Sequence, residues 1–371
     1  MGMRCVRCGT DNNLRDRTNN QGRCKNCNHP FAFEPSAVTN TKLKFTDPFF
    51  AKVINDISDQ NRLYFTPKQL FYLLDRRLKA KVDTSPICFG CTFVVMTIII
   101  AIVVGSLGGS IIPALGLSFL ISGIIYANRY QNGKIKPGKS FLISQAQSQD
   151  WITRWETING KSKMLPSPRS ESSNSEISPE ISAYSFDRVV ICDNTAIAQM
   201  LIANNFHFEN SCAVLSITGY PESIFSTVLD MLRRNLDLKV YALHDASPSG
   251  VSLVHNLRTS PDWFLNSNAV IYDLGLLPRQ IFSSRSVFVR NSTESAQSAK
   301  QLPEEVRRDL TSEELKWLDA GKFVELESFS PQRIIRVANQ GIAKSQAPDS
   351  SDSLILIDSG ADSVYVIESF G

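Results

Sequence analysis

Residues 188–194 read RVVICDN, an apolar run that suits a buried β-strand and leads directly into Asp193. Three further short runs of this kind follow at 212–218, 239–243 and 269–272. The segments between these runs have the apolar spacing of helices. Repeated strand–helix units predict a mostly parallel sheet with helices on both faces, and we assign this α/β domain to residues 186–343.

Three of these expected strands end at a polar residue or a glycine: Asp193, Gly219 and Asp245. In open parallel sheets, polar ligands bind outside the carboxyl ends of the strands. The pattern therefore predicts a ligand site at this edge of the sheet. An aspartate after a strand also caps the helix that follows, so a purely structural role for the aspartates stays open.

Four segments of this domain have a characteristic order and spacing. They are VVICDN at 189–194, ITGYP at 217–221, KVYALHDASPSG at 239–250 and LKWLDAGKFVELESFSP at 315–331. Together they resemble the Toprim domain of type IIB topoisomerase (topoisomerase VI) A subunits and of their meiotic double-strand-break relatives. The resemblance implies a Toprim-like α/β fold.

In that family, acidic residues bind magnesium, which stabilises charge during DNA strand cleavage and religation. The resemblance implies that Asp193 matches the first acid and that Asp245 matches the first aspartate of the family's pair. Ser247 stands where the second aspartate is expected, which removes one carboxylate from the implied magnesium site. For the family's tyrosine nucleophile, Tyr64 and Tyr72 are available. We therefore expect a degenerate Toprim-like domain.

Four of the eight cysteines lie in two C-x-x-C pairs near the start of the sequence, Cys5 with Cys8 and Cys24 with Cys27. No apolar signal run precedes them, so a reducing setting favours metal over disulfides. Two such pairs supply the four thiolates of a closed tetrahedral zinc site, which has no open position for chemistry. Residues 1–35 also resemble a zinc ribbon.

Basic residues gather in this predicted ribbon. They are Arg4, Arg7, Arg15, Arg17, Arg23 and Lys25. Such a cluster suits contact with nucleic acid, contact with lipid headgroups, or an ordinary solvated face. The formal net charge of +3 is too small to argue for nucleic acid by itself.

The stretch 84–128 contains no Asp, Glu, Lys or Arg, and it is long enough for two bilayer-spanning helices. The glycine-rich run 105–110 suits a turn between them. We therefore predict a transmembrane helical hairpin at 86–128, with a buried helical pair as the alternative. Basic residues flank both ends, which predicts an integral membrane protein, in contact with the lipid bilayer, with both termini in the cytoplasm.

The rest of the sequence divides by composition into three parts. Residues 43–82 have helical apolar spacing, and Thr66-Pro67 marks the start of a helix there. Residues 129–185 form a basic flank and then a flexible linker rich in serine and proline. Residues 354–371 have the pattern of a C-terminal β-hairpin.

Three functions fit these features. The favoured interpretation is a membrane-anchored, non-catalytic binding or scaffold protein, whose degenerate Toprim-like domain binds an unknown protein partner or a nucleotide ligand. The alternatives are a magnesium-dependent enzyme that cleaves nucleic acid through Asp193 and Asp245, and a membrane tether for DNA. The missing second aspartate favours the non-catalytic interpretation.

Overall fold

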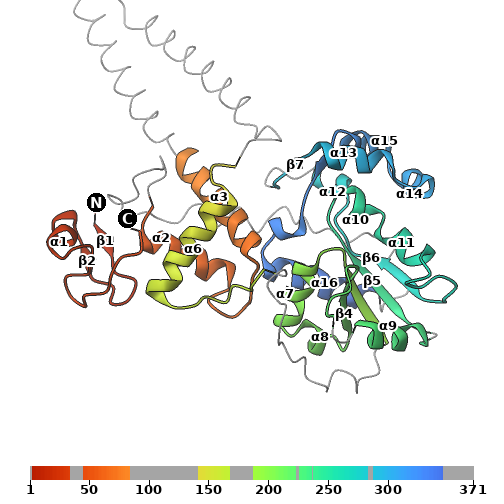
Figure 1. Cartoon of the computed structure of the whole chain (residues 1–371), viewed down its shortest axis with the longest axis horizontal. Coiled ribbons are helices and arrows are strands. Elements are labelled where there is room, and N and C mark those ends of the chain that lie inside the picture. Colours follow the sequence, from red (N-terminus) through yellow and green to blue (C-terminus); the bar gives the residue numbers. More distant parts are fainter. Residues whose placement is uncertain are drawn as a thin grey trace, which may run out of the picture. The chain divides into compact units, whose positions relative to one another are not determined.

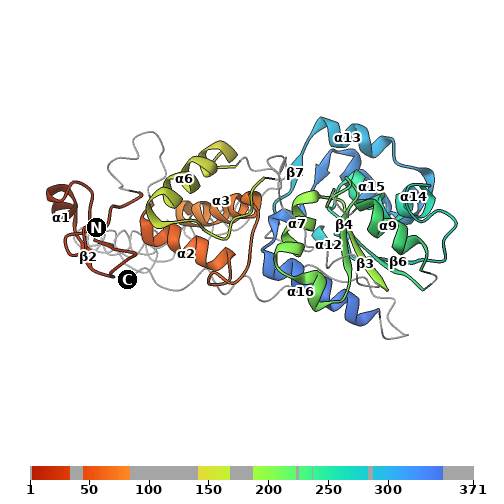
Figure 2. The same ribbon diagram turned by 60° about the horizontal axis from the view of Figure 1, so that its bottom comes forward.

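The computed structural model describes residues 2–33, 45–83, 141–167, 187–222, 225–235, 237–282 and 287–345. The chain divides into two units: Met1–Leu74 together with Ile143–Gly371, and Asp75–Leu142. Figures 1 and 2 show the elements of the first unit in two orientations. The candidate site lies in this unit, which is therefore described in more detail.

A four-stranded sheet forms the centre of the α/β domain. Its strands are β3 (Arg188–Cys192), β4 (Ala213–Ser216), β5 (Lys239–Leu243) and β6 (Val270–Asp273). They lie in the order β4-β3-β5-β6, and each neighbouring pair is parallel. The predicted parallel sheet is thus confirmed, and all four carboxyl ends meet at one edge.

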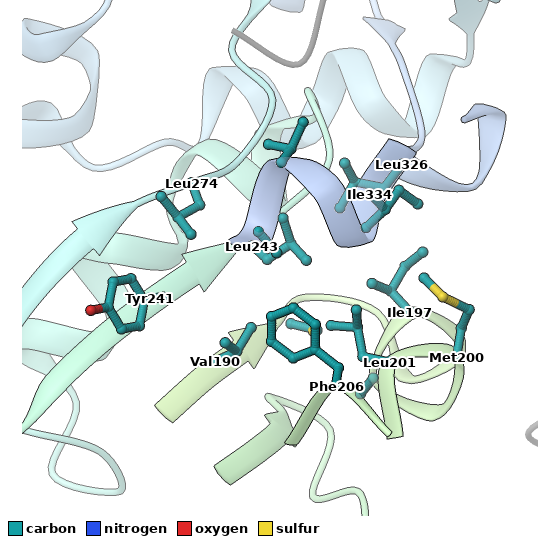
Figure 3. Packing of buried hydrophobic residues seen from close by; sticks show 14 of the residues in the cluster. Val190, Ile197, Met200, Leu201, Phe206, Tyr241, Leu243, Leu274, Leu326 and Ile334 are labelled. Atoms are coloured by element: carbon teal, nitrogen blue, oxygen red, sulfur yellow. The ribbon is translucent and has the colours of Figure 1, made fainter. Parts of the chain in front are cut away.

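Helices cover both faces of this sheet (Figure 1). On one face, strand residues such as Val190 and Tyr241 pack with helices α7 (Thr195–Ala203) and α16 (Pro331–Lys344) (Figure 3). On the other face, the residues that alternate with them pack with α9 and α11. Those helices span Phe225–Arg233 and Leu253–Thr259. Because both faces are buried, the strands are continuous apolar runs rather than alternating ones.

The elements after the fourth strand bring the end of the domain back to the sheet. They include α12 (Pro278–Phe282), β7 (Arg290–Asn291), α13 (Thr293–Lys300), α14 (Glu304–Asp309), α15 (Ser312–Asp319), β8 (Lys322–Phe323) and the 3-10 turn η3 (Leu326–Ser328). Next to β8, Val324 and Ala246 exchange two backbone hydrogen bonds of 3.0 Å. This bridge places the acidic segment ELES, residues 325–328, beside the carboxyl end of β5.

The first described residues form a small β-pair and a helix, β1 (Met3–Arg4), β2 (Asp11–Asn12) and α1 (Leu14–Asn19). They are joined to the next helix, α2 (Asp47–Ile57), through a buried carboxylate. Asp47 accepts hydrogen bonds from the backbone N–H groups of Ala32 and Phe33, at 2.9 and 2.7 Å. The ring of Phe33 also packs on Phe50 and Trp155.

One helix lies where the sequence predicted a basic flank and a flexible linker. Helix α6 (Gln145–Asn159) falls within the predicted range 129–185. Ser144 and Gln147 form a capping box at its start, and Trp151 and Trp155 are buried on one face. This polar sequence forms a helix because its two buried tryptophans are anchored: Trp155 packs on Phe50 of α2, and Trp151 packs on Phe45, which precedes that helix.

Helix α3 (Pro67–Asp83) begins where the sequence predicted, at Thr66-Pro67. The Gln69 N–H donates to Thr66 Oγ1 at 3.1 Å, and the Thr66 N–H donates to Gln69 Oε1 at 2.9 Å. These reciprocal bonds satisfy backbone donors at the start of the helix. In the second unit, Asp75 accepts a bond from the N–H of Leu142 at 2.7 Å.

The structure corrects the prediction of an integral membrane protein that contacts the lipid bilayer and has both termini in the cytoplasm. Within the described ranges, no helix has the length and the apolar character that crossing a membrane requires. The predicted hairpin at 86–128 and the predicted C-terminal β-hairpin at 354–371 lie outside the described residues.

We expect Asp47→Ala to lower the stability of the chain by about 2 kcal/mol, because it leaves two buried N–H donors without an acceptor. The measurement is the urea midpoint of the full chain. Asp150→Ala is the matched control, since Asp150 is exposed on α6 and should change stability by less than about 0.5 kcal/mol. Equal midpoints for the two variants would show that the Asp47 carboxylate does not stabilise this junction.

Candidate functional site

A cleft of about 860 Å³ lies at the carboxyl edge of the sheet. The α/β domain contributes Asp193, Thr195, Thr218, Asp245, Ser249 and Glu327 to its lining. The facing wall comes from the first turns of α3 and α6 and from residues 166–167. The carboxyl edge of the sheet, at which the sequence predicts a ligand site, therefore forms one wall of this cleft.

Asp193 and Asp245 lie beside each other in this cleft. Asp193 Oδ2 accepts a hydrogen bond from the N–H of Asp245 at 2.8 Å, and Asp245 Oδ1 accepts one from the N–H of Leu326 at 2.6 Å. Asp193 Oδ1 is buried and has no hydrogen-bond partner among the described residues. A buried carboxylate oxygen without a partner is costly unless a proton or a cation satisfies it.

The electrostatics of the two aspartates agree with this geometry. Burial raises the pKa of Asp193 to about 6. Burial, together with the nearby charge of Asp193, raises the pKa of Asp245 well above its usual value. Two neighbouring carboxyl groups whose ionised forms are disfavoured by burial form a place where a cation would be stabilised.

Ser247, at the position where the resemblance predicts a second aspartate, has a structural role. Its Oγ accepts a bond from the N–H of Gly250 at 3.0 Å and caps the short helix α10 (Pro248–Val251). Gly250 itself is needed for space, because a Cβ there would lie 2.0 Å from the carbonyl oxygen of Asp245. The loop after β5 thus presents one carboxylate to the cleft instead of two.

A buried histidine lies directly beneath this edge. His244 Nε2 is 2.9 Å from Asp273 Oδ1, and its Nδ1 is 2.9 Å from the carbonyl oxygen of Asp245. Burial alone would lower the pKa of His244, but Asp273 and then Asp193 raise it to about 9. The imidazole is therefore charged at neutral pH, and its positive charge partly offsets Asp193. This arrangement gives His244 an electrostatic role rather than that of a general base.

Glu325 is the centre of a charged network that was not predicted from the sequence. Its Oε1 accepts bonds from Lys68 Nζ at 2.7 Å and Arg290 Nη1 at 3.0 Å. The hydroxyl of Tyr72 donates to its other oxygen. Burial would raise the pKa of Glu325, but Lys68, Tyr72 and Arg290 lower it below its usual value. This network fastens α3 to the α/β domain.

Glu327 completes the acidic wall, and it was not predicted from the sequence either. It accepts bonds from Thr66 Oγ1 at 2.8 Å and from Asn194 Nδ2 at 3.2 Å, and Lys68 Nζ lies 3.6 Å away. Each oxygen of its carboxylate thus accepts one bond from the protein, and burial raises the pKa of Glu327 above its usual value. The stretch KFVELESF contains both glutamates, and its acidic-apolar alternation was the one signal that could have found them.

Neither tyrosine considered as a nucleophile lines the cleft as described. Tyr72 is buried, and burial and the charge of Glu325 raise its pKa, which disfavours the phenolate. Tyr64 is partly exposed, and the centroid of its ring lies 4.7 Å from Lys163 Nζ. Neither Tyr64 nor Tyr72 is therefore placed to attack a group held by Asp193 and Asp245.

The four N-terminal cysteines converge as predicted. Their sulfurs all lie within 4.8 Å of one another, with Cys5 Sγ 3.6 Å from Cys27 Sγ and Cys8 Sγ 3.6 Å from Cys24 Sγ. Among the described residues, this is the one group of three or more potential ligand atoms gathered so closely. The chemistry and spacing of these donors suit a tetrahedral metal ion.

Part of the basic character of this segment is used internally. Arg17 is buried and donates to the carbonyl oxygen of Asn12 at 2.7 Å. Lys25 forms an ion pair with Asp16 at 2.9 Å. Arg23 also donates to the carbonyl oxygen of Asn28 at 3.3 Å. Three of the six basic residues thus hold the segment together, which weakens the argument that their charge exists to bind nucleic acid.

Comparison with known families gives a match to the α/β domain. Residues 188–340 match the family model for the Toprim domain of topoisomerase 6 A subunits and Spo11. No curated protein matches the chain. The match confirms the Toprim part of the predicted resemblance and suggests a topoisomerase-like, nucleic-acid-related function. It covers less than half of the 371 residues and does not include the cysteine cluster.

We expect Glu325→Gln to destabilise the full chain by about 2 kcal/mol at pH 7, because Lys68 and Arg290 lose their shared carboxylate. Glu325 has a lowered pKa, so its contribution is complete above the usual value of 4.5 and is lost as the pH falls through its folded value. The difference between wild type and variant should therefore shrink below pH 4.5.

The measurement is the urea midpoint of both proteins across that pH range. Glu304→Gln is the control, because the Glu304–Arg308 pair is exposed and should contribute less than about 0.5 kcal/mol. A Glu325 effect as small as that of Glu304, or one that grows with acid, would contradict the proposed role of the network.

Proposed function

We propose that the Toprim-like domain is a cation-dependent phosphate-binding module with a nucleic-acid-related function, and that it does not cleave strands by itself. The observation that carries this proposal is the buried Oδ1 of Asp193, which has no partner among the described residues and lies beside Asp245 in the cleft. Magnesium is commonly held by one or two carboxylates, with water and substrate phosphates completing its shell. Asp193 and Asp245 are the two carboxylates at this edge that have no ion-pair partner among the described residues.

Asp193 and Asp245 would hold the ion, and the ion would supply positive charge to a phosphate group in the cleft. The other charges at the site are compensated by residues of the protein. His244 offsets part of the negative charge from below, while Glu325 and Glu327 are engaged by Lys68, Arg290 and other donors. The negative charge of Asp193 and Asp245 thus suits a single cation. A site with three free carboxylates would carry more negative charge.

Strand cleavage requires a nucleophile in line with the phosphate. The buried Tyr72 phenol is held by Glu325, and Ser247 caps a helix instead of adding a ligand. These two departures support binding without cleavage. The Toprim match supports the link to nucleic acid, and the magnesium-dependent nuclease is the competing function that the second test below addresses.

The first test is titration of the full chain with Mn²⁺, a paramagnetic substitute for Mg²⁺, followed by electron paramagnetic resonance. We expect one site that excess Mg²⁺ displaces and that weakens at least roughly tenfold in Asp193→Asn and in Asp245→Asn. Asp262→Asn removes an exposed carboxylate that does not line the cleft and should leave binding unchanged. Unaltered Mn²⁺ binding in both cleft variants would rule out this site.

The second test is incubation of supercoiled plasmid with the full chain and Mg²⁺, analysed on agarose gels. The proposal expects no nicked or linear product above that of the Asp193→Asn protein. Nicking that depends on Asp193 and Asp245 would instead establish the enzyme and refute the non-cleaving function. A gel-shift series over increasing salt reports phosphate contacts separately, because such contacts weaken steeply with salt.

We also propose that Cys5, Cys8, Cys24 and Cys27 hold a structural zinc ion, in agreement with their mutual distances. Elemental analysis of the full chain should then find one zinc per chain, which is lost in Cys24→Ser. Asn26→Ser, in the same turn, removes no thiolate and should retain the metal. A chain that carries no zinc after purification and after reconstitution would overturn this assignment.

A further inference from the structure

We infer that the cleft admits a single phosphorylated nucleoside unit and excludes a continuous duplex. Such a unit is either a free nucleotide or the phosphorylated end of a single strand, which share the same chemistry. This inference rests on the proposed cation site and deepens it by naming the class of ligand. Three observations carry it: the fixed wall opposite the sheet edge, the size of the cleft, and the chemistry of its two sides.

The wall opposite Asp193 and Asp245 is fastened to the α/β domain at several points. Thr66 donates to Glu327 at 2.8 Å, and Gln69 Nε2 donates to the carbonyl oxygen of Phe329 at 3.1 Å. The Glu325 network adds the contacts of Lys68 and Tyr72. The bonds of Thr66, Gln69 and Tyr72 are buried, so opening this wall would expose several polar groups at once.

The cleft has the size of a small-molecule site. Its volume of about 860 Å³ falls in the range of roughly 300–1,000 Å³ that holds small ligands and cofactors. A duplex bound at a sheet edge needs an open surface along which both strands can run. The first turn of α3 occupies that space here, because Pro67, Lys68 and Phe71 line the cleft.

The two sides of the cleft offer different chemistry. The sheet side carries the two aspartates and the hydroxyls of Thr195, Thr218 and Ser249, which suit a cation and phosphate oxygens. The facing side includes the carbon surfaces of Pro67 and Pro166, which suit an apolar, flat group such as a nucleobase. A nucleotide has both kinds of surface in one molecule.

Lys68 supplies the protein's own positive charge to this ligand. It lines the wall that faces the aspartates, and its ammonium group bonds to Glu325 at 2.7 Å and lies 3.6 Å from Glu327, which leaves one of its three donors uncommitted. The remaining donor capacity is available to a phosphate oxygen on the side away from the cation. Lys68 is thus the residue whose removal should weaken ligand binding without removing the cation site.

The experiment uses the full chain with saturating Mn²⁺ and mant-ADP, a fluorescent nucleotide, as the probe. We expect saturable binding that weakens roughly tenfold in Lys68→Met, and Mn²⁺ binding in that variant should weaken by a smaller factor. Lys300→Met is the matched control, because Lys300 is exposed on α13 and does not line the cleft. Thr218→Val is a second cleft variant that retains all charges and should also weaken the probe.

Competition then identifies the source of the phosphorylated unit. Displacement by ADP but not by a 5′-phosphorylated oligothymidylate supports a free nucleotide. Displacement by the phosphorylated strand, but not by its unphosphorylated counterpart, supports a strand end. Covalently closed plasmid should not compete at equal phosphate concentration, and equal competition by it would overturn the inference.

Failure of the inference and failure of the proposed cation site give different results. If Mn²⁺ binds and depends on Asp193 while mant-ADP does not bind, the nucleotide inference is wrong and the cation site stands. If Mn²⁺ does not bind at Asp193 and Asp245, both are wrong. Circular dichroism of each variant shows whether a loss of binding reflects a loss of fold.

Discussion

The ion-pair network of Glu325 is the interaction on which the candidate site depends. Lys68 and Glu325 are separated by 257 residues in sequence, and their contact joins α3 to the carboxyl edge of the sheet. Without this carboxylate, the α3 wall would keep only neutral contacts and its bonds to Glu327. The backbone bridge between Ala246 and Val324 makes the network possible, because it delivers the ELES segment to the end of β5.

The distribution of charge around the edge explains what kind of chemistry the site can support. Glu325 is matched by two cations and Asp273 by His244, so these groups are paired within the protein. Among the described residues, Asp193 and Asp245 have no ion-pair partner of this kind, and burial raises the pKa of both. A single divalent cation, coordinated by these two aspartates and by a phosphate group, would offset their negative charge.

Much of the α/β domain could be predicted from local sequence patterns. Buried strands such as RVVIC produce a continuous apolar run, and Asp193 after β3 marks the edge of the sheet. Polar ligands bind at this edge in open parallel sheets. Both predicted aspartates do line the cleft. The role of magnesium there stays a prediction, and so do the zinc ion and the domain boundaries.

Other features depended on contacts between distant residues, which periodicity does not report. The segment that forms helix α6 was predicted to be a flank and linker because it is mostly polar, and its two buried tryptophans pack on Phe45 and on Phe50 of α2. Lys68 carries no motif of its own, and its role follows only from the packing of α3 on the sheet edge. The prediction of an integral membrane protein was made from composition, and within the described ranges no helix is long and apolar enough to cross a membrane.

The hydroxyl of Thr66 forms hydrogen bonds with two segments at once, the start of α3 and the segment that contains Glu327. It accepts the Gln69 N–H that starts α3, and it donates to Glu327 at the sheet edge. Fraying of the first turn of α3 therefore removes a donor from Glu327, and movement of Glu327 weakens the helix start. Amide hydrogens in the two segments should consequently exchange with solvent as one cooperative unit, although they lie far apart in the sequence.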